Sequence, residues 1–104
     1  MYGLIGKIRS TPGQRDALQA ILLESQGGMP GCFSYVLAQD PSDPDALWVT
    51  EVWDSQASHS ASLSLPSVQG QIARAKPIIA GFTDRVVTTP VGGIGLPPEA
   101  ASTK

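Results

Sequence analysis

With 104 residues and a mass of 10.9 kDa, the chain has the usual size of one domain, which can hold a core but is small for a deep private cavity without a partner subunit. Hydrophobic residues make up 41% of it and charged residues 15%, a composition typical of globular proteins. The net charge is -2 and the seven Lys and Arg residues are scattered, which argues against nucleic acid and anionic membranes as partners because both bind clustered cations.

The chain carries no segment that indicates export or insertion into a membrane. No apolar run approaches the roughly 20 residues that a membrane-spanning helix needs, and the N-terminus lacks the charged and then apolar pattern of a secretion signal. A cytoplasmic location is therefore expected. Cys32 is the single cysteine, so neither an intrachain disulfide nor a Cys-rich metal site is expected, and its apolar neighbours favour a small core residue.

Two alternating segments in the first half of the chain predict β-strands. The first runs from Tyr2 to Arg9, where Gly3 and Gly6 indicate a close backbone approach or a bulge. The second runs from Cys32 to Gln39 and is apolar on both sides, so one face should pack on helices and the other on something besides water, most simply a second subunit. The turn at 40–45, with two prolines and three acids, predicts a hairpin into the next strand.

An amphipathic helix is predicted between these two strands. Ser10 or Thr11 can cap its start, Pro12 fits its first turn, and Gly27 and Gly28 are expected to end it. Its apolar face carries Ala17, Leu18, Ile21 and Leu22.

The segment from Ala46 to Leu65 gathers both tryptophans and the single histidine. Side chains of a strand alternate in direction, so the strand expected at its start presents two distinct faces. One face carries Leu47, Val49, Glu51 and Trp53, and the other carries Trp48, Thr50 and Val52. Asp54 and Ser55 then offer N-cap oxygens for a second helix, whose first turn can fold His59 back over Trp53.

The following part of the chain predicts a broken helix and a last strand. Pro66 interrupts the second helical region, which restarts over 67–75, and Gly81 gives a break before a β-branched strand at 84–89. The restarted helix should turn Val68, Ile72 and Ala75 inward. The order strand, helix, strand, strand, helix, strand is that of the α+β ferredoxin-like fold, a four-stranded antiparallel sheet with helices on one face.

One domain is expected over residues 1–90. The remaining segment, 91–104, is rich in Gly, Pro and Ala and is expected to be either a flexible tail or an arm laid across a partner subunit. Ile94 and Leu96 are the apolar side chains that such an arm would use.

Several motifs, in this order, resemble the antibiotic biosynthesis monooxygenase family, which includes small quinol monooxygenases. They are Thr11-Pro12-Gly13, Pro30-Gly31-Cys32 with Tyr35 in the strand that follows, Asp40-Pro41, and above all Glu51-Val-Trp53-Asp54-Ser55-Gln-Ala57-Ser-His59. The resemblance covers Tyr2 to about Pro90. It implies a ferredoxin-like fold whose sheets pair face to face in a homodimer, a dimeric α/β barrel, and oxygen chemistry that uses neither metal nor flavin, so that no cofactor is expected.

This chemistry needs a particular set of side chains. A deprotonated phenol or hydroquinone can pass an electron to dioxygen directly, so the protein must supply a base, a dry pocket and aromatic walls for a flat ring. His59 is expected to be the base, Trp53 to stack on the ring or donate its indole N–H, and Glu51 to orient His59 or a water molecule. Further contacts to a small aromatic substrate are expected from Tyr35, Ser34 and Leu63.

The same residues also have structural explanations. His59 can be a hydrogen-bonded packing residue, Trp53 can fill the core, and Glu51 can pair with Lys7 or Arg9. Trp48, which faces the other way, is expected to anchor a dimer interface.

Two other classes of function therefore stay open. One is a small-molecule-binding dimer without turnover, and the other is a dimerisation module, which should have no ligand-sized pocket. Haem degradation is less expected, because relatives that perform it combine a helical His with an Asn and a Trp. This chain contains no Asn, and the spacing from Trp53 to His59 is short.

Overall fold

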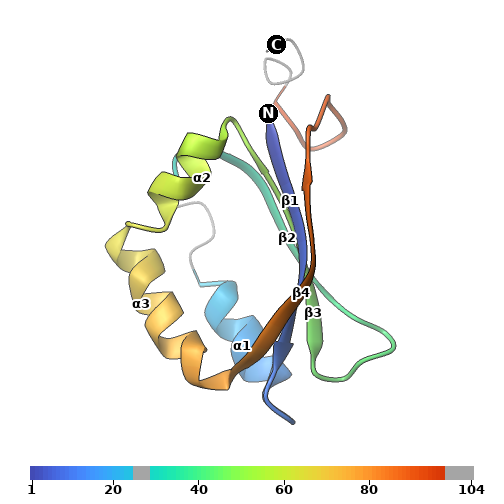
Figure 1. Cartoon of the computed structure of the whole chain (residues 1–104). Helices are drawn as coiled ribbons and strands as arrows, with labels where there is room; N and C mark the ends of the chain where they lie inside the picture. The colour runs from blue at the N-terminus through green and yellow to red at the C-terminus, as the bar shows by residue number, and fades with distance from the viewer. Residues whose placement is uncertain (25–28, 98–104) are drawn as a thin grey trace.

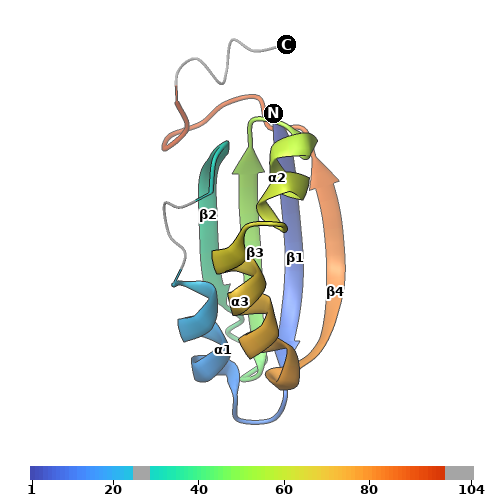
Figure 2. The same ribbon diagram turned by 90° about the vertical axis from the view of Figure 1, so that its left-hand side faces the viewer.

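The computed structural model describes residues 1–24 and 29–97, which form one antiparallel sheet covered on one face by helices (Figure 1). In chain order the elements are β1 (Tyr2–Ser10), α1 (Arg15–Leu22), β2 (Cys32–Gln39), β3 (Ala46–Trp53), α2 (Gln56–Ser62), α3 (Pro66–Ala75), a 3-10 turn η1 (Lys76–Ile78) and β4 (Ile79–Thr88). The strand order is β2-β3-β1-β4, and each neighbouring pair is antiparallel. This confirms the α+β ferredoxin-like fold (Figure 2). The predicted helix end at Gly27 and Gly28, and the last part of the predicted tail, lie outside the described residues.

The core lies between the sheet and helices α1 and α3. Leu18 from α1 and Leu47 from β3 are completely buried, and Ile8 from β1 and Ala75 from α3 pack with them. The predicted apolar face of α1 is confirmed for Leu18, Ile21 and Leu22, whereas Ala17 is exposed. Within the described residues, no helix has the length and apolar character that crossing a bilayer requires.

Helix α1 begins later than predicted, at Arg15. The segment from Thr11 to Gln14 is a turn in which the Gln14 N–H donates to the Thr11 carbonyl at 3.0 Å. Pro12 in its second position and Gly13 at φ 77° in its third are typical of a type II turn. The predicted capping role of Ser10 or Thr11 was therefore wrong, because Pro and a left-handed Gly in sequence make a turn rather than a first helical turn.

Strand β4 begins earlier than predicted, at Ile79 rather than at residue 84. Gly81 does not break the chain but pairs with Arg9 of β1 inside the strand. Pairing with β1 supplies ladder hydrogen bonds along this segment, and this tertiary contact outweighs the weak strand propensity of glycine.

The predicted interruption at Pro66 is confirmed, since α2 ends at Ser62 and Pro66 is the first residue of α3. Pro is favoured there because the first helical N–H needs no partner within the helix. The buried stripe of α3 consists of Val68, Gln71 and Ala75. Ile72, which was predicted to face inward, does so but is 46% exposed.

The two glycines of β1 behave as the sequence indicated. A Cβ added at Gly3 would overlap the Thr88 hydroxyl oxygen of the neighbouring strand, so the approach of the backbones is close there. At Gly6 the pairing between β1 and β4 changes register, which is a β-bulge.

Candidate active site

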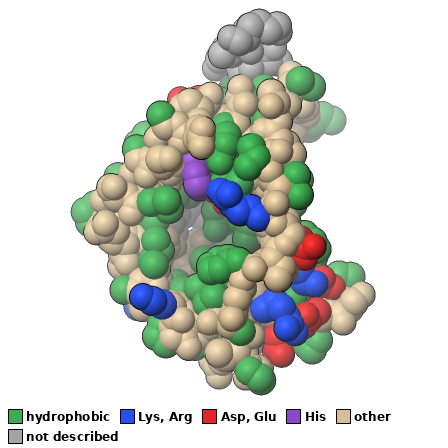
Figure 3. Space-filling model, viewed as in Figure 1, with side chains coloured by type: hydrophobic (Ala, Val, Ile, Leu, Met, Phe, Trp, Pro, Cys, Tyr) green, Lys and Arg blue, Asp and Glu red, His purple; other side chains and the backbone are tan. Residues whose placement is uncertain are grey.

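A cavity of about 410 Å³ lies between the helices and the covered face of the sheet. In the space-filling view it is a hollow with the imidazole at its edge and a cationic side chain beside it (Figure 3). Its wall is mostly apolar and includes Leu4, Ile8, Leu22, Val49, Val68 and Phe82. The volume falls in the range of small-molecule sites, which is about 300–1,000 Å³.

Strand β3 places two predicted site residues on the cavity face. Glu51 and Trp53 are two positions apart and so point to the same side, as the alternation predicted. The Trp53 ring is 1% exposed, and its indole N–H donates to Glu51 Oε1 at 2.9 Å. This bond satisfies the buried indole nitrogen and holds the carboxylate in one position.

Helix α2 brings the imidazole to the same place. The Ser55 hydroxyl caps the helix by accepting from the Ser58 backbone N–H at 3.1 Å, which fixes the first turn that carries His59. The His59 ring centroid lies 5.4 Å from that of Trp53 in an edge-to-face arrangement, and 5.7 Å from that of Tyr2. The predicted folding of His59 over Trp53 is therefore present.

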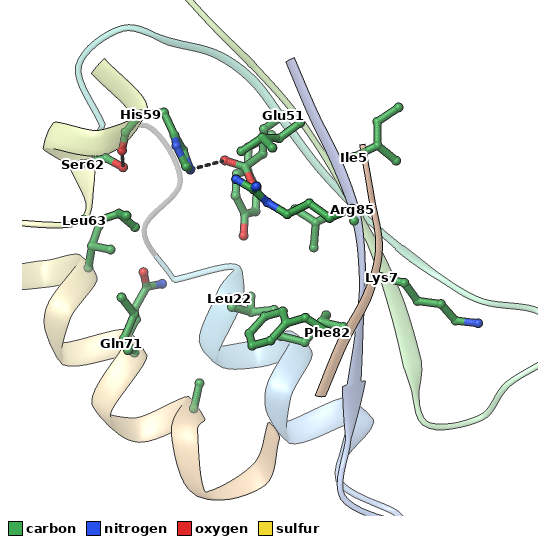
Figure 4. A pocket seen from close by; sticks show the side chains of 18 of the residues that line it. Ile5, Lys7, Leu22, Glu51, His59, Ser62, Leu63, Gln71, Phe82 and Arg85 are labelled. Carbon is green, nitrogen blue, oxygen red and sulfur yellow. Dashed lines mark hydrogen bonds and ion pairs between the residues drawn. The ribbon is translucent and has the colours of Figure 1, made fainter. Parts of the chain in front are cut away.

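His59 and Glu51 face each other inside the cavity wall (Figure 4). Nε2 of His59 is 3.9 Å from Glu51 Oε1, the same oxygen that accepts from Trp53. This distance is too long for a hydrogen bond, so the carboxylate acts on the imidazole through its charge. It can stabilise positive charge on the imidazole when that ring takes a proton from a bound ligand.

The alternative that Glu51 pairs with Lys7 or Arg9 was wrong. Glu51 lies on the helix-covered face, whereas Lys7 points away from the cavity (Figure 4). Lys7 Nζ is 3.3 Å from Asp40 Oδ2, and Arg9 Nε is 2.9 Å from Asp43 Oδ2. Because side chains alternate between the two faces of a strand, Lys7 and Arg9 lie on the face of the sheet opposite Glu51.

Two of the three predicted substrate contacts line the cavity. Tyr35 is the pairing partner of Glu51 on the neighbouring strand β2, so both side chains point into the cavity. Leu63 directly follows α2 and lines the cavity as well. Burial, and secondarily the charge of Glu51, raises the pKa of Tyr35 to about 12, so its phenol stays a hydrogen-bond donor at neutral pH. Ser34 does not contribute, because it pairs with Val52 and so lies on the opposite face of the sheet. Neighbouring side chains of a regular strand point to opposite faces of the sheet.

Gln71 and Arg85 also line the cavity and were not among the predicted site residues. Gln71 is 7% exposed, and its side-chain amide donates to the Ile21 carbonyl at 2.7 Å, which ties α3 to α1. Its spacing of three from Val68 was a signal that it belongs to the buried stripe. Arg85 of β4 enters the cavity as well (Figure 4). No local sequence signal indicates this, because its direction depends on the bulge described above.

The opposite face of the sheet carries the second tryptophan. Trp48 donates its indole N–H to Asp40 Oδ2 at 3.0 Å, and Lys7 Nζ lies 5.6 Å from the centre of its ring. Val36 and Val86, on the same face, are 54% and 50% exposed. The role of Trp48 as an interface anchor stays a prediction.

Cys32 lies half-buried at the start of β2 with a free thiol. Burial, and secondarily the charge of Glu51, raises the pKa of this thiol, so it is protonated at neutral pH and a weak nucleophile. Across the described residues, no three His, Cys, Asp or Glu side chains converge as they would around a metal ion.

Comparisons with known proteins agree with this architecture. A family model described as antibiotic biosynthesis monooxygenase matches residues 1–74. A crystal structure from Chloroflexus aurantiacus J-10-fl, provisionally named an antibiotic biosynthesis monooxygenase, is 66% identical, with a TM-score of 0.88 over 92% of this chain and 98% of that one. A Deinococcus radiodurans structure with the same provisional name is 25% identical, with a TM-score of 0.67 over 89% and 93% of the two chains. A Nitrosomonas europaea structure at 15% identity and a TM-score of 0.74, covering 90% and 99%, shares the fold. A search of curated proteins gave no match.

Proposed function

Because the chain belongs to the antibiotic biosynthesis monooxygenase family, we propose that it oxidises a quinol or polycyclic phenol with dioxygen in the cavity between sheet and helices. The observation that carries this proposal is the convergence of His59, Glu51 and Trp53 on the wall of a mostly apolar cavity of about 410 Å³. A base, an anion that supports it, held in place by the buried indole, and an apolar wall are the groups that the reaction needs.

The proposed reaction converts a hydroquinone and dioxygen into a hydroxyquinone and water. His59 removes a phenolic proton, and the resulting anion passes one electron to dioxygen to give a semiquinone and superoxide. These recombine at a ring carbon to form a C–O bond, and the peroxide takes up a proton. Loss of the ring hydrogen as a proton with cleavage of the O–O bond releases water. The substrate supplies all four electrons that dioxygen accepts, so the protein supplies no metal, flavin or other cofactor.

Each side chain has a defined task in this proposal. His59 holds the abstracted proton at Nε2, which faces the Glu51 carboxylate at 3.9 Å. Glu51, held by the Trp53 indole N–H, stabilises the charged imidazole. The protonated phenol of Tyr35 donates to an oxygen on the ring, and Leu63 closes the rim over it. Apolar walls keep water from the radical pair.

A homodimer belongs to the same proposal. The bare face of the sheet exposes Val36 and Val86 beside Trp48, so pairing two sheets through this face would bury them and leave both cavities on the outside of the barrel. Light scattering after size exclusion should give twice the chain mass, and Val36→Glu should reduce it to the monomer mass. A monomer in the unchanged protein would contradict this part of the proposal.

The competing functions make different predictions. A pure dimerisation module should have no ligand-sized pocket, and the cavity argues against it. A binding module without turnover should bind hydroquinones under nitrogen but add nothing to their spontaneous oxidation in air. Oxygen uptake with a panel of hydroquinones, compared with the rate without protein, separates these two outcomes.

Replacing the base tests the assignment of roles. His59→Gln should lower kcat by about 10²- to 10⁴-fold, the usual contribution of a general base. Ser60→Ala is the matched control, because Ser60 lies on the exposed side of the same helix and does not line the cavity. If His59→Gln leaves turnover unchanged across the pH range, His59 is not the base.

A further inference from the structure

Arg85 is placed to bind an anion at the cavity. Its guanidinium extends from β4 across the cavity toward Glu51 and His59 (Figure 4). In the part of the chain that the structure describes, no carboxylate lies within ion-pair distance of this guanidinium. The acid toward which it points, Glu51, already accepts the Trp53 indole N–H (Figure 4).

The direction of Arg85 is set by a β-bulge. Ile5 pairs with Val86 and Lys7 pairs with Thr83, so the single residue Gly6 of β1 stands opposite two residues of β4, Asp84 and Arg85. Asp84 takes the extra position with a φ of 54°, in the left-handed region. A bulge changes which side chains of a strand share a face, and here it puts Arg85 on the cavity side.

Without the bulge, Asp84 and Arg85 would exchange the faces of the sheet to which they point. Phe82 faces the cavity because it pairs with Ile8, so regular alternation would put Asp84 on the cavity face and Arg85 on the bare face. Instead, the Asp84 carboxylate is outside the cavity and accepts from the Thr83 hydroxyl at 3.0 Å. The fold thus maintains an unusual backbone conformation for Asp84, and the result is an exposed cation lining the cavity in place of an anion.

A purely structural role for Arg85 does not explain why the bulge turns this side chain toward the cavity. Arg85 is exposed to solvent where it stands, but the bare side of β4 would offer the same solvation at no conformational cost, so solvation alone does not explain the bulge. Balancing the charge of Glu51 would also not need the fork of a guanidinium, which matches the two oxygens of a carboxylate.

We propose that Arg85 binds a carboxylate of the ligand, so that the cavity selects aromatic hydroxy acids, with the ring between the apolar walls and the phenol at His59. This substrate class rests on the proposed function for the role of the phenol. The anchor itself is a binding property and can be measured without turnover.

The test compares two probes that differ only in the carboxylate. Binding of 6-hydroxy-2-naphthoic acid and of 2-naphthol is measured by calorimetry at pH 7 under nitrogen. The unchanged protein should bind the acid about tenfold or more tightly, the usual scale for a hydrogen bond between charged groups. Arg85→Gln should remove this preference and leave the affinity for 2-naphthol within about twofold. Arg85→Lys should keep part of it, because the charge remains but the fork is lost.

Two further variants test the bulge and the charge. Asp84→Gly keeps a residue that adopts positive φ, so both the bulge and the preference should be retained. Arg74→Gln removes the same charge from α3, where Arg74 pairs with Glu24 outside the cavity lining, and should retain the preference.

The outcomes separate this inference from the proposed function. Equal affinity for both probes, or a preference that survives in Arg85→Gln, would overturn the anchor even if quinols are oxidised. Weakening of both probes alike by Arg85→Gln would also overturn it, since the guanidinium would then act on the phenol. A carboxylate preference without any oxygen uptake supports the anchor and counts against the monooxygenase proposal alone.

Discussion

Gly31 sets how closely helix α2 approaches the start of β2, and its replacement by alanine should both destabilise the fold and displace His59. Gly31 has a φ of 83°, a conformation that costs an L-residue about 1 to 2 kcal/mol. A Cβ at this position would lie 2.7 Å from Asp54 Oδ1 and 2.8 Å from Ser58 Cβ. Ser58 Cβ is attached directly to the backbone of α2, so relief requires a shift of the helix. Overpacking of this kind costs about 1 to 3 kcal/mol. The free energy of unfolding should therefore fall by about 2 to 5 kcal/mol.

Gly13→Ala is the matched control for this prediction. Gly13 has nearly the same φ, 77°, but no heavy atom lies within 4 Å of an added Cβ, so only the conformational cost applies. Urea unfolding of both variants at one protein concentration isolates the contribution of the clash, expected at about 1 to 3 kcal/mol. Turnover should fall in Gly31→Ala, since a shift of α2 changes the 3.9 Å separation of His59 and Glu51. Equal losses of stability in the two variants would refute the reasoning.

Three further predictions concern ionisable groups and the bulge. The pKa of Tyr35, raised to about 12, exceeds the value near 10 of an unfolded chain, so its protonated phenol adds stability that is present below pH 10 and lost as the pH rises toward 12. Ultraviolet titration should show a tyrosinate forming near pH 12, and Tyr35→Phe should remove the alkaline loss; a full tyrosinate signal by pH 11 would contradict this. Asp84→Val should cost about 1 to 2 kcal/mol more than Asp84→Asn in urea unfolding, because Asn tolerates a φ of 54° and a β-branched residue does not; equal costs would argue against the bulge. A backbone N–H and then the Trp48 indole N–H hold the pKa of Asp40 below its ordinary value, so its contribution is present above about pH 4 and lost as the pH falls further. Asp40→Asn should flatten the fall of the urea midpoint over that acidic range, and an unchanged slope would show that Asp40 does not cause it.

Much of the fold could be predicted because its signals are local. The bounds of β2 and β3 agree with the alternating segments, and the break at Pro66 follows from the missing N–H of proline. Where prediction failed, a longer-range contact decided. Pairing with β1 extended β4 through Gly81, and a left-handed Gly13 made a turn where a capped helix start was expected.

The centre of the candidate site was also accessible from local pattern. Glu51 and Trp53 share a face because they are two residues apart in a strand, and a short, Ser-capped connection leaves His59 within reach of both. The contact of the two rings at 5.4 Å follows from these local constraints.

The sequence by itself thus determined the order of the elements, the two faces of β3 and the meeting of an imidazole with an indole, since alternation and capping depend only on neighbours along the chain. Only the tertiary structure decided that Arg85 enters the cavity, that Gln71 joins α3 to α1, and where β4 begins. A bulge exists only in the pairing of two strands, and a side chain next to it changes face with a register shift of one residue. The position of the Arg85 charge at the cavity is therefore a property of the assembled sheet and cannot be inferred from any single segment.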